Sequence, residues 1–213
     1  MSHSTAHLLP AHQTMLLAHR AMVRDLDRIA RTAVQLSASP DPEWAAALAS
    51  YTDTLFLVIE HHHAGEDEFL WPRLRQLGAD EAALNLMTRE HKELAKFLHA
   101  WHESTRRLAS GSEAAAEVAQ LTEDVRSHLA RHAGHEELEL LGRLAPALSK
   151  QLWSDFSAHM RKTAPSWAVR FLPAWLLSVA GPGEGHGVPL VFVGRLFSGW
   201  LEKRQRSAFG SNY

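Results

Sequence analysis

The sequence predicts an all-α protein: an up-down-up-down four-helix bundle followed by a helical C-terminal extension. Apolar residues recur at steps of three and four over four long stretches, as in helices that turn one face to a core. Short breaks rich in Pro, Gly and Ser separate these stretches, and no strand pattern of comparable quality occurs before residue 148. Long helices joined by short loops pack as antiparallel neighbours, which gives a bundle.

The first two helices are predicted over residues 8–36 and 41–77. The apolar seam of the first helix consists of Leu8, His12, Met15, His19, Met22, Leu26, Ile29, Ala33 and Leu36. Asp41 is a suitable N-cap for the second helix. Pro72 lies inside that helix and removes a backbone donor, so we expect a kink or a short break near Trp71.

The third and fourth helices are predicted over residues 80–108 and 113–144. The turn between them contains Gly111, and Ser112 is a suitable cap for the fourth helix. The large side chains of Trp71 and Trp101 are expected in the core.

The extension is predicted to differ in build from the bundle. Residues 1–148 form the bundle, whereas residues 149–213 are divided by Pro and Gly into short segments. We expect a helix over 150–163 and apolar segments over 173–179 and 189–203. The last segment places five apolar side chains on one predicted stripe: Leu190, Val193, Leu196, Phe197 and Trp200. This stripe could lie against the bundle, a partner subunit or a membrane surface.

Composition weighs against several classes of function. A formal net charge of −2 and a pI near 6.7 give no electrostatic case for binding nucleic acid or an anionic membrane. The absence of cysteine excludes disulfides, thiolate metal sites and cysteine nucleophiles. No secretory signal and no apolar run long enough to span a membrane is apparent, so a cytoplasmic location is expected. Histidine is unusually frequent, with fifteen copies.

Two related motifs combine histidine with carboxylates at helical spacing. Residues i and i+4 share one helix face, so His62 with Glu66, or His63 with Asp67, could reach one metal ion. A second motif seventy residues downstream selects the first register and therefore His62 over His63. It aligns six pairs: His62 with His132, Glu66 with Glu136, Asp67 with Glu137, Leu70 with Leu140, Arg73 with Arg143 and Leu74 with Leu144.

Each motif is preceded by one more histidine on an apolar seam, His19 in the first half and His91 in the second. The halves then supply six polar residues at one level of the bundle: His19, His62, Glu66, His91, His132 and Glu136. Each could be an ordinary buried polar residue. Burying two unpaired glutamates costs several kcal/mol each, however, and metal ions supply the compensation. Imidazole and carboxylate suit iron, manganese or zinc. Six ligands suit two ions bridged by carboxylates, with an oxide, hydroxide or exogenous anion to balance charge.

This ligand string resembles that of the hemerythrin family, specifically the bacterial hemerythrin-like proteins of the HHE cation-binding type, over residues 8–148. The resemblance implies two non-heme iron ions, joined by an oxo or hydroxo bridge, in a four-helix bundle of the kind found in myohemerythrin. It also implies that Glu66 and Glu136 bridge the irons. The terminal ligands would be His19 and His62 on one iron, and His91 and His132 on the other.

Two features differ from the oxygen-carrying hemerythrins. Ala95 stands where those proteins have a second histidine one turn after the third-helix ligand, and Glu136 replaces an Asp at a spacing of five. We therefore expect the second iron to lack one imidazole. His128, one turn before His132, could replace it, or could be a neighbouring donor or a plain core residue.

Other polar residues near the motif have alternative roles. His12 lies two turns before His19, about 10 Å along the axis, and is expected to line a channel or the bundle end. Asp67, Glu90 and Glu137 are next to the expected ligands and either orient imidazoles or form a solvated helix face.

Three functions are compatible with this sequence, and whether the protein is an enzyme is left open. The first is catalase-like reaction with hydrogen peroxide or a related oxidant, favoured by the missing ligand. The second is binding or sensing of dioxygen, nitric oxide or iron without turnover. The third is a metal-stabilised interaction protein whose extension docks a partner or forms a homo-oligomer. Ferritin-like oxygenases carry Glu-x-x-His instead, and no Gly-x-Ser-x-Gly elbow supports a serine hydrolase.

Overall fold

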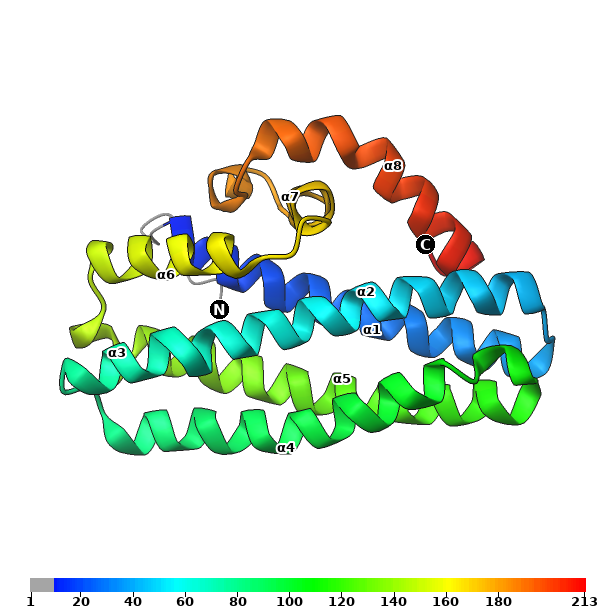
Figure 1. Ribbon diagram of the computed structural model, residues 1–213, viewed down its shortest axis with the longest axis horizontal. Coiled ribbons are helices and arrows are strands. Elements are labelled where there is room, and N and C mark those ends of the chain that lie inside the picture. Colours follow the sequence, from blue (N-terminus) through cyan, green and yellow to red (C-terminus); the bar gives the residue numbers. More distant parts are fainter. Residues whose placement is uncertain (1–9) are drawn as a thin grey trace.

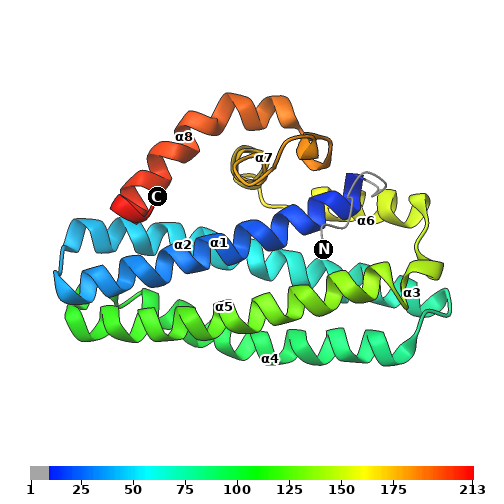
Figure 2. The same cartoon turned by 180° about the vertical axis from the view of Figure 1, so that it is seen from behind.

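The computed structural model describes residues 10–213, and its main body is a bundle of long helices (Figures 1 and 2). The bundle helices are α1 (Pro10–Ala38), α2 (Pro42–Gly65) with its continuation α3 (Trp71–Gln76), α4 (Glu81–Thr105) and α5 (Ser112–Leu141). Successive helices run in opposite directions, and no strand occurs in the part of the chain that is described. The predicted all-α bundle is confirmed. The predicted start at Leu8 lies outside the described residues.

The helix starts follow local capping chemistry. The Asp41 carboxylate accepts hydrogen bonds of 3.0 Å from the backbone N–H groups of Glu43 and Trp44, as predicted. Asp80 caps α4 in the same way, accepting from Ala83 N–H at 2.8 Å. The cap predicted at Ser112 is wrong, because Gly111 occupies the N-cap position of α5 with φ of 123°. Glycine adopts this backbone conformation without the strain that a Cβ causes.

A π-helical turn, η2 (Glu66–Leu70), joins α2 to α3 at the position where a break was expected. In this turn the Trp71 N–H bonds to the Glu66 carbonyl, five residues earlier. Pro72 has no N–H to donate, and its ring would crowd the carbonyl four residues before it in a regular α-helix. The wider turn accommodates the proline without ending the helix. Because η2 begins at Glu66, the irregular backbone includes a predicted ligand.

The bundle interior contains two apolar clusters. The larger runs along α1, α2, α4 and α5, continues into α7 and α8 of the extension, and includes the fully buried Trp101, whose indole N–H donates to Thr122 at 2.9 Å. The smaller contains Met15, Trp71 and Trp153 and lies toward α3 and α6. The buried positions of Trp71 and Trp101 agree with the sequence prediction.

The extension consists of α6 (Lys150–Thr163), α7 (Ala168–Leu177) and α8 (Val191–Phe209), linked by short turns (Figure 1). α6 has the predicted bounds, and its cap is Ser149, whose hydroxyl accepts from Leu152 N–H at 3.1 Å. α7 begins five residues earlier than expected and runs through Pro173. Burial of Phe171 and Trp175 in the same helix offsets the backbone bond that proline removes.

A buried polar network fastens the extension to the bundle. Asp25 of α1 is fully buried and accepts hydrogen bonds from the Tyr51 hydroxyl at 2.6 Å and from the Trp175 indole N–H at 2.7 Å. The amide of Gln205 on α8 donates to the same Tyr51 hydroxyl at 2.9 Å. Because these groups come from α1, α2, α7 and α8, one network ties the two parts of the chain together.

The apolar stripe predicted over residues 189–203 is divided in the structure: Leu190 and Leu196 are exposed, whereas Phe197 and Trp200 are partly buried against the core. The buried positions of this helix are Gly194, Leu201, Gln205, Ala208 and Phe209. A Cβ on Gly194 would lie 2.7 Å from the Pro173 carbonyl oxygen, so this glycine allows the close crossing of α7 and α8. The crossing determines which face of α8 turns inward. Among the described residues, no helix combines the length and apolar character needed to cross a membrane.

Candidate metal centre

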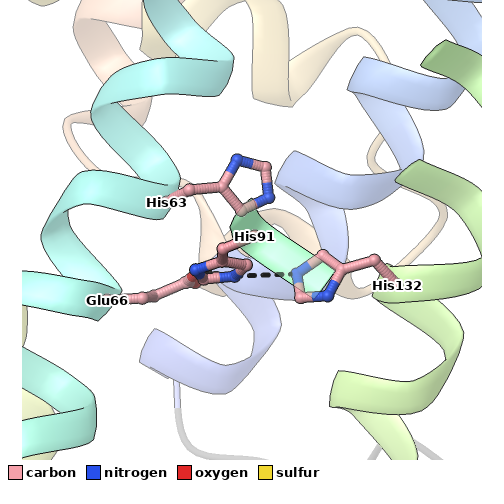
Figure 3. Close-up of side chains that lie close together, drawn as sticks. All are labelled: His63, Glu66, His91 and His132. Atoms are coloured by element: carbon pink, nitrogen blue, oxygen red, sulfur yellow. Dashed lines mark hydrogen bonds and ion pairs between the residues drawn. The ribbon is translucent and has the colours of Figure 1, made fainter. Parts of the chain in front are cut away.

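Seven buried side chains meet near the middle of the bundle, at the level where η2 begins. Six are the predicted residues: His19 from α1, His62 from α2, Glu66 from η2, His91 from α4, and His132 and Glu136 from α5. The seventh is His63 of α2 (Figure 3). The structure thus brings together all six residues selected from the sequence and adds one.

The donor atoms fall into two sets that share Glu66. The three-histidine set contains His63, Glu66, His91 and His132. The two-histidine set contains His19, His62, Glu66 and Glu136. Within each set the possible ligand atoms lie within 4.8 Å of one another. Two neighbouring sets with a common carboxylate are an arrangement that can hold a pair of cations.

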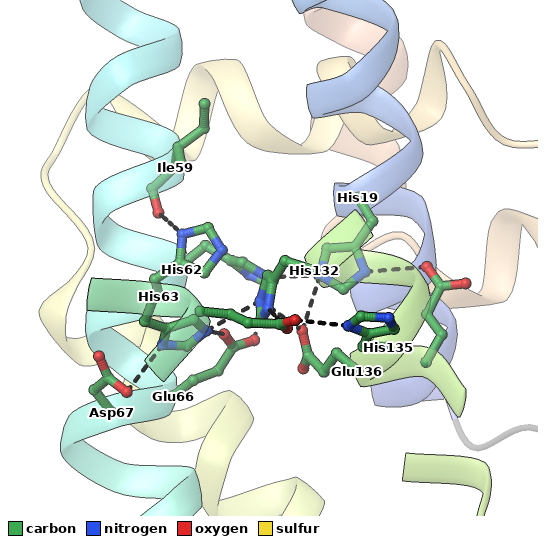
Figure 4. Close-up of polar contacts among 12 residues, drawn as sticks. His19, Ile59, His62, His63, Glu66, Asp67, His132, His135 and Glu136 are labelled. Carbon is green, nitrogen blue, oxygen red and sulfur yellow. Dashed lines mark hydrogen bonds and ion pairs between the residues drawn. The ribbon is translucent and has the colours of Figure 1, made fainter. Parts of the chain in front are cut away.

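Each glutamate lies between histidines of both sets (Figure 4). The Glu66 oxygens are 3.1 Å from His62 Nε2 and 3.6 Å from His91 Nε2. One Glu136 oxygen is 3.2 Å from His19 Nε2 and 3.5 Å from His132 Nε2. Both carboxylates therefore occupy positions from which they can bridge two ions.

The imidazoles are arranged as a cation would require. His91 Nδ1 lies 2.9 Å from the Asp67 carboxylate and His132 Nδ1 lies 3.2 Å from Glu90. A proton on each Nδ1 satisfies these contacts and leaves both Nε2 atoms as acceptors, yet the two Nε2 atoms are only 3.1 Å apart. Facing lone pairs repel unless a proton or a cation lies close to both, so the site fits a metal ion.

The carboxylates give a second, independent test of this fit. All four side-chain oxygens of Glu66 and Glu136 are buried without a hydrogen-bond partner. The nearest polar atoms to these oxygens are imidazole nitrogens, and a buried carboxylate without hydrogen bonds of regular geometry carries a large desolvation cost. Cations coordinated by these oxygens would remove that cost, and the donor set of imidazole and carboxylate is suited to iron, manganese or zinc.

His63 lies in a donor set although the register chosen from the sequence left it out. Its Nδ1 donates to the Ile59 carbonyl at 2.9 Å, which leaves Nε2 buried and without a partner. The ring lies 4.6 Å from that of His91 between centroids. His63 thus places a third imidazole beside His91 and His132, on the side where one imidazole was expected to be missing.

The signal for His63 was present in the run of three histidines. The repeat comparison excluded it because the equivalent position in the second motif is Ala133. Because α2 passes close to both donor sets, its consecutive residues His62 and His63 contribute to different sets. The second half of the chain has no such pair, since Ala133 follows His132.

Two other histidines considered from the sequence lie outside these sets. His128 does not replace the expected ligand: its Nδ1 donates to the Asp124 carbonyl of its own helix at 2.8 Å, and its ring packs 3.9 Å from that of Phe97. The ring of His12 lies 4.2 Å from Trp153 of α6, at the end of the bundle that α6 covers.

Three further carboxylates hold the imidazoles by their outer nitrogens. Asp67 contacts His91, Glu137 contacts His19 at 3.0 Å, and Glu90 contacts His132. Glu90 also contacts His135 Nδ1 at 2.6 Å and is itself buried, whereas Asp67 and Glu137 are partly exposed. These contacts fix ring orientation and increase the donor strength of Nε2, which supports the orienting role over that of a solvated helix face.

The protonation states of the metal-free site reflect burial and charge together. Burial lowers the pKa of His62 and His63, which are therefore neutral near pH 7. Burial also opposes charge on His19, but Glu136 and Glu137 outweigh it and raise the pKa of His19 to about 9. Burial and the nearby Glu136 raise the pKa of Glu66. Protons thus occupy part of the space that cations would take.

Comparison with known proteins agrees with this geometry. No curated protein and no solved structure gives a significant match to the chain. The family profile of the hemerythrin HHE cation binding domain matches residues 11–144, which include both donor sets and all the bundle helices except the first residue of α1. The buried histidine and glutamate cluster fits a metal site, and the chain belongs to the hemerythrin HHE cation-binding domain family.

Proposed function

We propose that this chain is a non-heme di-iron protein that reacts with hydrogen peroxide or a related small oxidant in a catalase-like manner. His63, His91 and His132 would hold one iron, His19 and His62 would hold the other, and Glu66 and Glu136 would bridge them. The oxo or hydroxo bridge expected from charge balance, and the cytoplasmic location expected from the sequence, belong to the same proposal.

The observation that carries the proposal is the unequal supply of donors. The three-histidine set offers three imidazoles, whereas the two-histidine set offers two imidazoles beside Glu66 and Glu136. Iron coordinated by nitrogen and oxygen commonly takes six ligands, so the two-histidine set leaves more positions for a small molecule. Because His63 adds a third imidazole beside His91, the ion with fewer imidazole ligands would be the one beside His19.

Decomposition of peroxide converts two molecules of hydrogen peroxide into two of water and one of dioxygen. Bound iron would supply the redox equivalents by alternating between two oxidation levels. The chain must supply a place for the protons that move. His19 Nδ1 contacts the partly exposed Glu137 at 3.0 Å, so this carboxylate can exchange protons with solvent while it orients the imidazole. All seven donors are buried, so we expect only small oxidants to reach them.

The test combines metal analysis with oxygen evolution. Iron content and the optical spectrum are measured on aerobically purified protein, and dioxygen release is then followed after addition of hydrogen peroxide. We expect about two irons per chain and sustained release that the iron-free protein lacks. Protein loaded with zinc is the matched control, because zinc occupies similar donors but has no redox chemistry. Two irons with no turnover would reject the peroxide reaction while retaining the metal centre.

The second candidate is reversible binding or sensing of dioxygen or nitric oxide. It is favoured by the enclosure of the site, since each of the seven donors is at most 9% exposed. An enclosed centre can admit a diatomic molecule and release it unchanged. A spectral change that reverses when the gas is removed, with no peroxide turnover, would favour this candidate.

A further inference from the structure

The small net charge of the chain conceals two parts of opposite charge. Residues 149–213 contain eight Lys and Arg residues against three Asp and Glu residues. Residues 1–148 contain fourteen against twenty-one. A basic extension is thus attached to an acidic bundle. The net charge of the whole chain does not show this division. The positive charge of the extension attracts it to anionic surfaces.

The basic extension also carries the two most exposed large apolar side chains among the described residues, Phe192 and Leu196, with the exposed Leu190 close to them in sequence. Phe192 is 79% exposed, Leu196 is 76% exposed and Leu190 is 55% exposed. We call these three residues the apolar tip. Phe192 and Leu196 are four residues apart on α8 and share one face of it. Leu190, just before α8, has φ of 51°, an unfavourable conformation for leucine, so the chain accepts backbone strain at this place.

The apolar tip cannot turn inward without breaking the contact that positions α8. Gly194, between Phe192 and Leu196, is buried against the Pro173 carbonyl of α7. The opposite face of α8 therefore looks away from α7. In Figure 1 the start of α8 lies at the edge of the molecule farthest from α4 and α5. The tip is consequently a projection and not the floor of a groove.

Basic side chains continue the outward face of α8. The exposed Arg195 lies beside Leu196, and exposed Lys203 and Arg206 follow at helical steps from it through Gly199. The acidic Glu202 pairs with Arg206 at 2.8 Å and offsets one of these charges. The face thus begins with apolar groups and ends with cationic groups.

These observations favour one kind of partner. A stable protein interface buries about 800 Å² on each side and involves roughly 20–30 residues, far more than three projecting side chains supply. Reversible attachment to a membrane needs only a few inserted apolar groups together with basic residues near anionic headgroups. We propose that the extension docks the protein peripherally on an anionic lipid bilayer, with the apolar tip inserted and the acidic bundle directed away.

The experiment measures binding of the full-length, metal-loaded protein to lipid vesicles by flotation. One vesicle type contains phosphatidylcholine alone, and the other contains phosphatidylcholine with about 30% phosphatidylglycerol. We expect at least about tenfold stronger binding to the anionic vesicles, because each nearby Lys or Arg contributes about a fivefold gain. Raising the salt concentration should weaken this binding. Equal binding to both vesicles, or no binding to the anionic ones, would overturn the proposal.

A pair of variants distinguishes insertion of the apolar tip from non-specific adsorption of exposed apolar residues. Phe192→Ser with Leu196→Ser changes exposed residues and should reduce vesicle binding about tenfold or more. Leu138→Ser changes a residue of α5 that is 68% exposed and should leave binding unchanged. Metal content of each variant verifies that the bundle is intact. Unchanged binding by the double variant would reject the tip as the docking element.

Self-association is tested with the same proteins in the absence of lipid. Sedimentation over a range of protein concentrations should give the same species for the wild type and the double variant. A concentration-dependent dimer that the double variant loses would assign the tip to a second copy of the chain and would overturn the membrane proposal. Vesicle binding does not depend on peroxide chemistry, so the two proposals fail independently.

Discussion

His19 and His62 face each other across the two-histidine set with their Nε2 atoms 3.0 Å apart. His19 is also held by Glu137 at Nδ1 and lies 3.2 Å from the Glu136 carboxylate at Nε2. In the metal-free protein a proton between these groups relieves the repulsion of the facing nitrogens. A metal ion placed there must displace that proton, which couples metal binding to pH.

Metal binding is therefore expected to release protons and to strengthen as pH rises. Burial opposes charge on His19, but Glu136 and Glu137 outweigh burial and raise its pKa to about 9, so the metal-free imidazole holds its proton below that pH. Apparent metal affinity should increase from about pH 6 toward about pH 9. Calorimetric titration with Zn²⁺ in buffers of different ionisation enthalpy measures the released protons. No release near neutral pH would contradict the displacement of a proton from His19.

Removal of the metal is expected to lower the thermal stability of the bundle. Metal at one hundred times its dissociation constant stabilises a folded protein by about 2.7 kcal/mol. For a chain of this length that corresponds to a fall in Tm of roughly 5–10 °C after chelation. Circular dichroism of chelated and reloaded protein measures the change. A chelated protein that unfolds at the same temperature would show that the buried Glu66 and Glu136 need no cation.

Replacement of His63 separates the seven-residue site from the six-residue site. His63→Ala removes one imidazole from the three-histidine set, so we expect weaker binding of one ion and a metal content close to one per chain. His128→Ala is the matched control, since its ring lies on Phe97 and its Nδ1 bonds to its own helix. Metal analysis after dialysis measures both. Equal metal content in the two variants would restore the six-residue assignment.

Glu90 is expected to matter more than the other carboxylates that touch the imidazoles. It is buried and accepts from both His132 and His135, and the amide of Glu90→Gln can satisfy only one of them. We expect metal affinity to fall by about 10–100-fold. Asp67→Asn makes the same chemical change at a partly exposed contact to His91, where water can replace the lost acceptor. Competition with a chelator compares them, and equal losses would show that burial of Glu90 has no effect.

Much of this site could be predicted from the sequence because it is built on regular helices. Spacing of four residues within α2–η2 and within α5, repeated after seventy residues, is enough to select His62, Glu66, His132 and Glu136. His63 could not be found in that way, since Ala133 breaks the repeat at its position. A comparison of the two halves identifies ligands that both halves contain, and it misses a ligand that only one half contains.

The extension shows where local pattern fails. Spacing alone grouped Leu190 and Leu196 with Trp200 on one apolar stripe and left open whether the stripe faces the bundle, a partner subunit or a membrane. In the structure both leucines are exposed, whereas Trp200 is partly buried against the core. The inward face is determined by Gly194 at its crossing with Pro173, a contact between residues of two different helices. The apolar periodicity of α8 does not reveal this contact, because glycine has no side chain that would contribute to a hydrophobic pattern.

His12 is expected to make the folded protein sensitive to acid. Burial lowers its pKa from 6.5 to about 4, so between these values the unfolded chain binds more protons than the folded chain. Its contribution favours unfolding as pH falls from 6.5 to about 4 and is absent above 6.5. The imidazole is partly exposed, so the loss is on the order of 1 kcal/mol after allowance for solvent.

The acid sensitivity is measured as the free energy of unfolding of metal-free protein across this pH window. His12→Gln should flatten the stability curve, because the substituted side chain has no proton to bind. His99→Gln, a change at an exposed position, controls for the substitution itself. If stability depends on pH in the same way in His12→Gln, the acid sensitivity comes from other groups. Protonation of the His12 imidazole, which packs on Trp153, would then not destabilise the folded protein.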